Sequence, residues 1–362
     1  MKKPSETTVF VGVSGGVDSS VSLALLQEQG YRVVGVFIRT WQPDWIECTW
    51  RDERRDAMRV CAHLNVPFVE LDLEKEYKEG VADYMIREYR SGRTPNPDVM
   101  CNREVKFGGF LRWALDKGAD YVATGHYVDR LVNENGSVTM LRGNDPQKDQ
   151  SYFLWTLTQE QLQHILFPVG NIPKSHVRKL AKKYNLPTAV KKDSQGICFI
   201  GDIDMKDFLR HYINEQEGSV LNAYGEIIGT HNGALFYTIN ERHGFLIHKE
   251  FKGTNDNPYY VIAKDIENNT ITVSQNPEQD TEVVTSYCLV DMVDNQNIFS
   301  VEQDLEAQIR YRGSVKKITI NEFNSIQKTA IITFSEPDPT IAPGQSVVFY
   351  KGRTCLGGGI IA

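Results

Sequence analysis

The sequence predicts an α/β domain with a doubly wound parallel sheet, followed by a small β-rich central domain and a C-terminal β-barrel. Three observations predict this order. Strand-like and helix-like segments alternate through the first third of the chain, a mostly helical pattern follows, and short strand-like segments separated by turn residues fill the rest. A chain of 362 residues is also too long for one ordinary core. We therefore expect domains at 1–210, 211–280 and 281–362, with 141–210 as a helical extension of the first.

The first domain is expected to alternate strand and helix. Runs such as TTVFVGV are typical of buried parallel strands, and Gly30 is a typical helix C-terminal cap. In such sheets, ligands bind beyond the carboxyl ends of the strands. We expect strands at 7–13, 31–38, 66–72 and 120–127, and helices at 18–30, 51–65, 75–89 and 103–117. Later strands are expected at 225–239, 258–265, 270–275, 305–313, 315–320, 329–335 and 345–350.

Composition excludes several classes of protein. The formal net charge is −7, which argues against a surface coated in basic charge but leaves room for a local nucleic-acid patch. No apolar run approaches the length of a membrane span, and the N-terminal stretch lacks a signal-peptide core. The six cysteines include no C-x-x-C pair, which disfavours a zinc or redox motif. We expect a cytoplasmic protein with no membrane partner, no bound metal of its own and no permanent cofactor.

The stretch VGVSGGVDSS joins the first strand to the first helix and predicts a phosphate-binding loop. Its glycines let backbone amides approach a ligand, the helix N-terminus adds a positive dipole end, and an aspartate could hold a phosphate-bridging metal ion. It lacks the lysine of a Walker A loop. The alternative is a tight glycine turn followed by a serine or aspartate cap. The candidate residues are Gly12, Val13, Ser14, Gly15, Gly16, Val17, Asp18 and Ser19.

The stretch TPNPDVMCN offers an acid and a thiol behind two stiffening prolines. We expect a rigid loop that fixes Asp98, a possible general acid or base, relative to Cys101. Cys101 is expected just before a helix, with Arg103 and Lys106 close enough to favour the thiolate. The alternative is a proline-rich turn in which Asp98 caps the helix and Cys101 is buried.

A second candidate thiol, Cys198, lies in KKDSQGICFIGD. Gly196 permits a sharp bend beside it, and two lysines precede it. The alternative is a turn that enters a strand with the thiol on its buried face. Cys61, in AMRVCAHL, is expected to be an ordinary buried side chain of a helix.

These residues carry a resemblance to a known family. The stretches VSGGVDSSV, EYRSGRTPNPDVMCNREVKFGGFL, GADYVATGHYVDR, DQSYFLW, LFPVG, VRKLAKKYNLPTAVKKDSQGICFIGD, IRYRG and APGQSVVFY…LGGGII make the chain resemble the bacterial tRNA-specific 2-thiouridylases nearly end to end. The loop itself resembles the SGGxDS loop of the ATP pyrophosphatase (PP-loop) superfamily. The resemblance implies the adenine nucleotide alpha hydrolase-like fold of that superfamily for the first domain.

The resemblance implies an ATP-dependent sulfurtransferase. ATP, with Mg²⁺, adenylates the C2 oxygen of the wobble uridine in the tRNA anticodon, and a persulfide on Cys198 then delivers sulfur. By the same resemblance, Cys101 would act as the nucleophile that leaves a Cys101–Cys198 disulfide, and Asp98 would act as general acid/base. A persulfide carrier protein is implied as sulfur donor, and the target base is expected to be flipped out.

The resemblance also implies individual contacts. Ile38 and Gly125 would contact the adenosine, although without the family Ile38 is simply core and His126 a structural histidine. A stretch from 171 to 192 with seven Lys/Arg and no acid adds a candidate RNA surface. One loop, TINERHGFLI, departs from the family pattern TIGQRKGLGI, so we assign it no RNA contact. The implied tRNA-binding residues are Asn96, Pro97, Asp98, His126, Lys148, Asp149, Gln150, Arg310, Tyr311 and Gln345.

Two other functions remain open from the residues. Another ATP pyrophosphatase, such as a ligase that uses ammonia, explains the loop but gives no role to the two cysteines. A non-catalytic RNA-binding protein with a relic loop is disfavoured by the intact SGGVDS.

Overall fold

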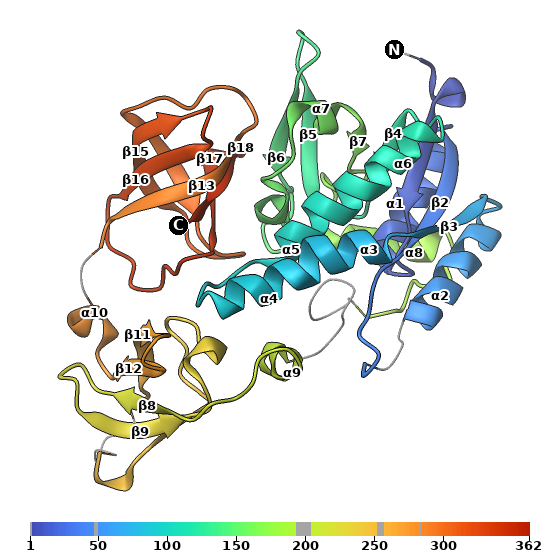
Figure 1. Ribbon diagram of the computed structural model, residues 1–362. Helices are drawn as coiled ribbons and strands as arrows, with labels where there is room; N and C mark the ends of the chain where they lie inside the picture. The colour runs from blue at the N-terminus through green and yellow to red at the C-terminus, as the bar shows by residue number, and fades with distance from the viewer. Residues whose placement is uncertain (1, 47–49, 193–203, 252–256, 282–283) are drawn as a thin grey trace.

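A computed structural model describes residues 2–46, 50–192, 204–251, 257–281 and 284–362. The strands of these parts form a five-stranded parallel sheet, a five-stranded mixed sheet and a closed barrel, which confirms the predicted fold class. In Figure 1 the parallel sheet and its helices lie on the right, the barrel at the upper left and the mixed sheet at the lower left. Among the described residues, no helix has both the length and the apolar character needed to span a membrane.

The parallel sheet has the strand order β3-β2-β1-β4-β7. The chain moves from β1 outward in one direction and then returns to place β4 on the other side of β1. The carboxyl ends of β1 and β4 therefore form a topological switch point, where such sheets bind ligands. The strands are β1 (Thr8–Gly12), β2 (Arg32–Arg39), β3 (Phe68–Asp72), β4 (Tyr121–Ala123) and β7 (Ile165–Leu166).

Helices cover both faces of this sheet. Alternate side chains of β1 serve the two faces: Val9 and Val11 belong to one buried cluster, and Phe10 belongs to the other. The first face carries α1 (Val17–Glu28), α2 (Trp50–His63) and α8 (Lys174–Lys183). The second carries two composite helices, α3 (Glu74–Tyr77) with η2 (Lys78–Ala82) and α4 (Asp83–Arg90), and α5 (Pro97–Met100) with η3 (Cys101–Phe110) and α6 (Leu111–Asp116). Gly30, with φ +87°, follows α1 as predicted.

The remaining elements of this domain are short. Two of them, β5 and β6, form a hairpin that the sequence analysis did not predict. They are η1 (Pro4–Glu6), β5 (Val128–Val132), β6 (Val138–Arg142), η4 (Ser151–Leu154) and α7 (Gln159–Gln163).

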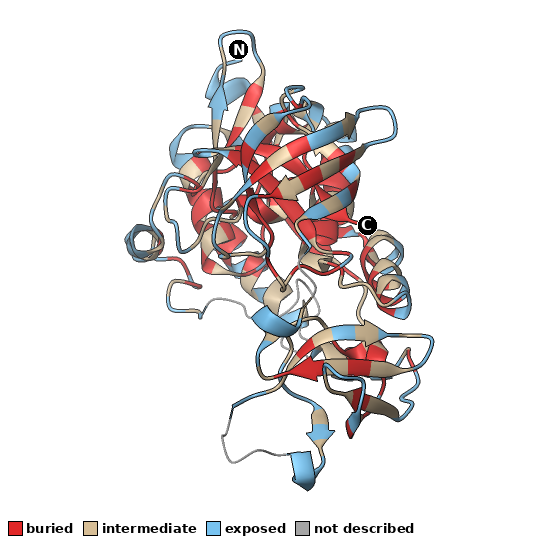
Figure 2. Ribbon diagram, turned by 90° about the vertical axis from the view of Figure 1, so that its left-hand side faces the viewer, coloured by how far each residue is buried: buried red, intermediate tan, exposed pale blue. Residues whose placement is uncertain are grey.

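The central domain is a five-stranded sheet with the order β10-β9-β8-β12-β11. The strand expected over 225–239 is wrong in its second half, because it ends at His231 and Gly233 then takes φ +132° before a 3₁₀ turn. Figure 2 shows a buried strip along these strands, below the larger buried interior of the first domain. The elements are α9 (Met205–Arg210), β8 (Gly218–Leu221), β9 (Ile227–His231), η5 (Ala234–Phe236), β10 (Phe245–Ile247), η6 (Lys249–Phe251), β11 (Tyr260–Asp265), β12 (Thr270–Ser274) and α10 (Pro277–Asp280).

The C-terminal domain is a six-stranded barrel that is closed by pairing of β13 with β18. β18 also pairs with β6 of the first domain, so hydrogen bonds join the barrel to that domain. At Gly357 a Cβ would lie 1.9 Å from the carbonyl oxygen of Val293, which explains the glycine at this position of the strand. The strands are β13 (Ser286–Asp294), β14 (Gln303–Gln308), β15 (Lys316–Asn324), β16 (Thr329–Phe334), β17 (Ser346–Lys351) and β18 (Thr354–Ile361).

Candidate active site

The glycine-rich loop lies at the carboxyl end of β1, as predicted. Gly15 has φ +69°, and a Cβ there would lie 2.4 Å from the carbonyl oxygen of Glu53 on α2. Gly16 is the N-cap of α1, and Ser20 is the first amide in the helical ladder, bonded to the Gly16 oxygen at 3.3 Å. The amides before Ser20 belong to the open, positive end of the helix. The loop therefore has the backbone geometry of an anion site.

The serine hydroxyls hold the loop in shape. Ser19 Oγ accepts a hydrogen bond from the Ser14 amide at 3.3 Å and donates to the Gly16 carbonyl oxygen at 3.3 Å. The predicted loop residues Val13 and Val17 are buried, and Gly12 ends β1. The Val13 amide bonds the Val36 oxygen at 2.8 Å and so belongs to the sheet.

Asp18, the acid of the loop, has two partners that sequence reasoning missed. The Lys174 ammonium lies 2.7 and 2.8 Å from its two carboxylate oxygens, and the Tyr127 hydroxyl donates to it at 2.7 Å. Lys174 is far from Asp18 in sequence. The one feature that marked it in the sequence was its place at the start of a helix, in a stretch without acidic residues.

Gly125 packs directly against the start of α1. A Cβ at this position would lie 2.6 Å from the Ser19 nitrogen and 2.8 Å from the Asp18 carbonyl carbon. The loop after β4 thus approaches the phosphate loop so closely that no side chain fits between them. Ile38, the other residue implied to contact adenosine, is a buried residue of β2. Both nucleotide contacts stay predictions.

We expect Gly125→Ala to weaken ATP binding by about tenfold, because the new methyl group must push the first turn of α1 away. Titration of ATP against the purified variant measures the change. Gly118→Ala is the control. A Cβ at Gly118 would meet nothing within 4 Å, so this variant carries only the backbone strain of alanine at φ +82°. Equal losses in the two variants would contradict a specific role of the Gly125 contact.

His126 is buried, with 8% of its surface exposed. Its Nδ1 is 2.8 Å from Thr124 Oγ1, and its ring centroid is 5.8 Å from that of Phe107. Burial, aided by the positive charge of Lys106, holds the pKa of His126 well below its ordinary value. The structure thus shows a buried, hydrogen-bonded histidine, and its implied tRNA contact stays a prediction.

This lowered pKa predicts a pH dependence of stability. Above the unfolded-state pKa of about 6.5 the ring is neutral in both states, whereas at lower pH only the unfolded chain takes up the proton. The free energy of unfolding should therefore fall by up to about 1.4 kcal/mol per pH unit below that value. Thermal melts at several pH values compare the wild type with His126→Asn. If His126→Asn lost stability just as steeply at acid pH, His126 could not be the source of the pH dependence.

The segment that carries Asp98 and Cys101 is a helix rather than a rigid loop. The helix begins at Pro97, and Asn96 caps it by accepting a hydrogen bond from the Val99 amide at 3.2 Å. The expectation that Cys101 precedes the helix is wrong, because a proline in the first helical position is compatible with helix initiation. Asp98 and Cys101 are therefore three residues apart on one helix, a spacing that puts side chains on the same face.

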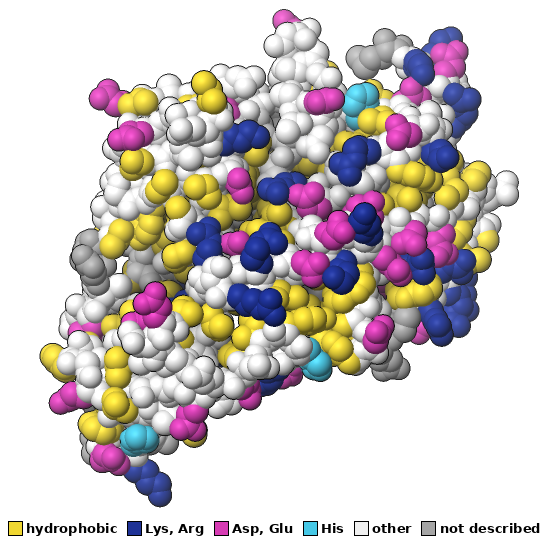
Figure 3. Space-filling view, in the orientation of Figure 1, with side chains coloured by type: hydrophobic (Ala, Val, Ile, Leu, Met, Phe, Trp, Pro, Cys, Tyr) yellow, Lys and Arg dark blue, Asp and Glu magenta, His cyan; other side chains and the backbone are white. Residues whose placement is uncertain are grey.

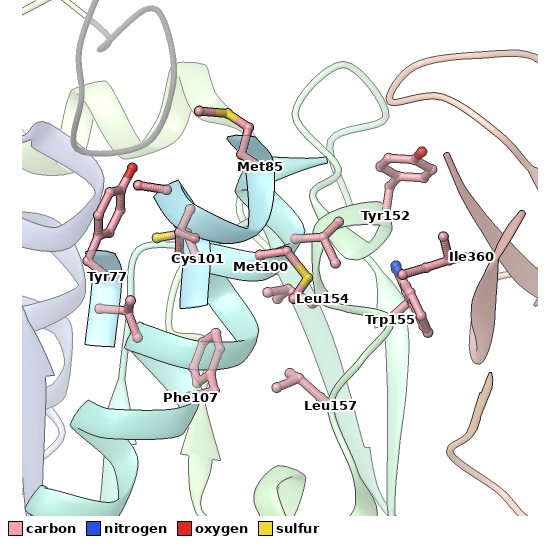
Figure 4. Packing of buried hydrophobic residues seen from close by; sticks show 14 of the residues in the cluster. Tyr77, Met85, Met100, Cys101, Phe107, Tyr152, Leu154, Trp155, Leu157 and Ile360 are labelled. Atoms are coloured by element: carbon pink, nitrogen blue, oxygen red, sulfur yellow. The ribbon is translucent and has the colours of Figure 1, made fainter. Parts of the chain in front are cut away.

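Cys101 is fully buried, at 0% exposure. It belongs to the same core cluster as Tyr77 and Met100, where Figure 4 shows its sulfur among apolar side chains. Arg103, expected to favour the thiolate, instead pairs with Glu104 at 2.7 Å. Asp98 is half-buried. Cys198 lies outside the described residues, so its relation to Cys101 stays a prediction.

Four of the implied tRNA contacts surround one cavity of about 400 Å³. They come from three distant segments: Asn96 before α5, Arg310 and Tyr311 after β14, and Gln345 before β17. The first domain and barrel are joined here by a hydrogen bond of 2.7 Å from the Thr94 amide to the Pro343 oxygen.

The loop to which we assigned no RNA contact lines the same cavity, through residues 238–241. Asn240 takes φ +70°, a conformation that asparagine tolerates better than most residues. Glu241 forms an ion pair with Lys206 on α9, and the cavity therefore does not present an isolated negative charge there.

The segment KDQ, residues 148–150, is held by internal hydrogen bonds. Asp149 accepts from the Gly143 amide at 2.9 Å and pairs with Arg142 at 3.0 Å, and Gln150 accepts from the Tyr127 amide at 2.9 Å. Lys148 and Asp149 also line a second cavity of about 610 Å³. The tRNA contacts of Lys148, Asp149, Gln150 and Pro97 stay predictions.

Several cations of the basic stretch 171–192 have partners among the described residues. Lys183 pairs with Glu28 at 3.0 Å and Lys191 with Asp56 at 2.8 Å. Arg178 donates to backbone oxygens of the same stretch. On the face drawn in Figure 3, Lys and Arg side chains are interspersed with Asp and Glu side chains.

Three family models match successive parts of the chain. They are described as a tRNA methyl transferase HUP domain over residues 7–202, a tRNA methyl transferase PRC-barrel domain over 206–275 and an aminomethyltransferase beta-barrel domain over 290–361. Curated relatives match from end to end. The tRNA-specific 2-thiouridylase MnmA of Bacillus licheniformis is 46% identical, over 99% of this chain and 96% of that protein. The protein of the same name from Streptococcus thermophilus is 45% identical, over 100% and 96%.

Solved structures match the fold weakly. A 4-thiouridine synthetase–RNA complex with bound ATP has 18% identity and a TM-score of 0.34, over 54% of this chain and 45% of that one. An NMN synthetase from Francisella tularensis has 16% identity and a TM-score of 0.32, over 53% and 67%.

Proposed function

The chain belongs to the family of tRNA-specific 2-thiouridylases, and from this premise we propose that it replaces the C2 oxygen of the tRNA wobble uridine with sulfur at the expense of ATP. It is thus a tRNA sulfurtransferase. The observation that carries the proposal is the proximity of two elements at the switch point of the parallel sheet. The phosphate loop contacts Gly125, and the helix of Asp98 and Cys101 contacts the adjacent His126 through Phe107.

The phosphate loop serves the activation step. A carbonyl oxygen is a poor leaving group, so the C2 oxygen attacks the α-phosphorus of ATP and pyrophosphate leaves. The former carbonyl oxygen is then part of an AMP leaving group. The open amides at the start of α1 hold the outer phosphates and stabilise the negative charge that develops on them.

The two cysteines serve the sulfur-transfer step. A persulfide carrier protein loads Cys198, whose outer sulfur attacks C2 and expels AMP. The Cys101 thiolate then attacks the Cys198 sulfur, which breaks the S–S bond, completes the C2 thiocarbonyl and leaves a Cys101–Cys198 disulfide. Asp98 takes up and returns the protons that this exchange moves. A dithiol reductant must cleave the disulfide before the next turnover.

A Mg²⁺ ion that arrives with ATP would fit one carboxylate, that of Asp18. One carboxylate together with substrate phosphate oxygens is a common way for proteins to hold Mg²⁺, which neutralises phosphate charge. Both Asp18 oxygens contact Lys174 in the described structure, so a cation there would replace the ammonium. No group of three or more His, Cys, Asp or Glu suited to a metal occurs in the described ranges.

The tRNA is proposed to lie across the 400 Å³ cavity between the first domain, the central domain and the barrel. Arg310 supplies positive charge and Tyr311 an aromatic face, which suit phosphate contacts and base stacking in single-stranded RNA. Asn96 connects this cavity to the helix of Asp98 and Cys101, because it caps that helix and also lines the cavity.

The products of ATP cleavage test this proposal. We expect formation of AMP and pyrophosphate to depend on added tRNA that carries an unmodified wobble uridine. Formation of ADP and phosphate instead, or AMP formation that ignores tRNA, would overturn it.

A further inference from the structure

We propose that Lys174 is a phosphate-binding residue of the ATP site, which contacts the outer phosphates that leave as pyrophosphate. This inference rests on the proposed function and adds a residue that the sequence analysis assigned only to a general RNA patch. Its basis is the position of the ammonium group, which lies 2.7 and 2.8 Å from the Asp18 oxygens at the mouth of the phosphate loop.

The side chain of Lys174 is held inside the site. Its side chain is 13% exposed, against 30% for that of Asp18. The ammonium also lies 5.7 Å from the centre of the Tyr127 ring, whose hydroxyl donates to the same carboxylate. A lysine packed this deeply, beside the open amides of α1, contributes its charge where a polyanion would bind.

The position of Lys174 in its own helix points the same way. It is the first residue of α8, and that helix has no acidic residue in its first turn. A cation at the positive end of a helix is electrostatically unfavourable, so local helix stability does not explain the residue. Its backbone amide is fixed by Asp145, which accepts from it at 3.0 Å. The helix start therefore presents a fixed lysine toward the neighbouring α1.

Charge balance explains how the ligand would be accommodated. Without ATP, the ammonium neutralises the partly buried carboxylate of Asp18. When ATP binds, the flexible four-carbon side chain can turn from the carboxylate to the outer phosphates. Lys191 instead pairs with Asp56 of α2 at 2.8 Å, so Lys174 is the better candidate.

Binding of three probes tests the inference. We expect Lys174→Met to weaken binding of inorganic pyrophosphate and of ATP by about 10- to 100-fold, as loss of a charge-assisted contact does, while AMP affinity changes less than about twofold. Lys117→Met is the matched control, because it removes the same charge from an exposed position on the same domain. Calorimetric titration of each probe gives the affinities.

A thermal melt accompanies each titration. Should Lys174→Met melt far below the wild type, Lys174→Gln gives the same comparison, because its amide can still donate to Asp18. The inference is overturned if both variants bind pyrophosphate as the wild type does, or if AMP affinity falls as much as pyrophosphate affinity, which a purely structural role would cause. If the wild type itself bound neither ATP nor pyrophosphate, the proposed function would fall with it; unchanged variants beside an active wild type refute the role of Lys174 alone.

Discussion

Cys101→Ser is expected to form no detectable 2-thiouridine and to keep tRNA-dependent release of pyrophosphate. The reason is that the thiol acts after activation: without it, the bond between Cys198 and the transferred sulfur cannot be resolved. Liquid chromatography of digested tRNA measures the product, and a pyrophosphate assay measures the first step. When a persulfide donor supplies the sulfur, Cys198→Ser should likewise form no 2-thiouridine and still release pyrophosphate.

The control for Cys101→Ser is Cys61→Ser. Cys61 is also 0% exposed, and burial raises the pKa of its thiol to about 11, so it is not suited to nucleophilic attack. Both substitutions place a hydroxyl in an apolar core, at a cost of about 1–3 kcal/mol. Substantial thiolation by Cys101→Ser, or an equal loss in Cys61→Ser, would contradict the nucleophilic role.

Asp18→Asn is expected to lower the rate of pyrophosphate release by about 100-fold or more, because the site loses the carboxylate that would hold the Mg²⁺ ion arriving with ATP and that positions the Lys174 ammonium. Asparagine has nearly the same shape and can still accept from Tyr127, so the loop should remain folded. Rapid-quench measurement of pyrophosphate at saturating ATP and tRNA gives the rate.

Asp120→Asn provides the comparison for this variant. Asp120 lies just before β4, at the amino ends of the strands, where it accepts from the Thr8 amide at 2.8 Å and pairs with Lys2 at 2.6 Å. It should keep the wild-type rate. A normal rate in Asp18→Asn would show that the loop does not serve ATP cleavage in the way we propose.

Local patterns predicted the elements that hold the site. The β-branched run of β1 and the glycines that follow it specify a buried strand, a tight turn and a helix start, because each depends on residues adjacent in sequence. β7 has two residues and no pattern to detect. β18 is interrupted by glycines that only its close contacts with neighbouring strands explain, such as that of Gly357 with Val293.

The sequence predicted the position of the phosphate loop, but not the contacts between residues that are distant in the chain. Asn96 and Pro97 are a helix N-cap and first helical residue, yet in sequence the pair also fits an extended loop, and so the start of the helix was placed too late. The Lys174–Asp18 pair joins residues 156 apart, and charge in one stretch gives no sign of a carboxylate so far away. The possible burial of Cys101 was foreseen as an alternative, and the structure shows it.

The mass of the wobble nucleoside tests the central claim most directly. Unmodified tRNA is incubated with the wild-type protein, ATP-Mg²⁺, a persulfide donor and a dithiol reductant, then digested and analysed by mass spectrometry with fragmentation of the base. We predict exchange of one oxygen for one sulfur at C2 of the wobble uridine, and no exchange when ATP is omitted. An unchanged nucleoside, or one that gains a methyl group in place of sulfur, would contradict the account.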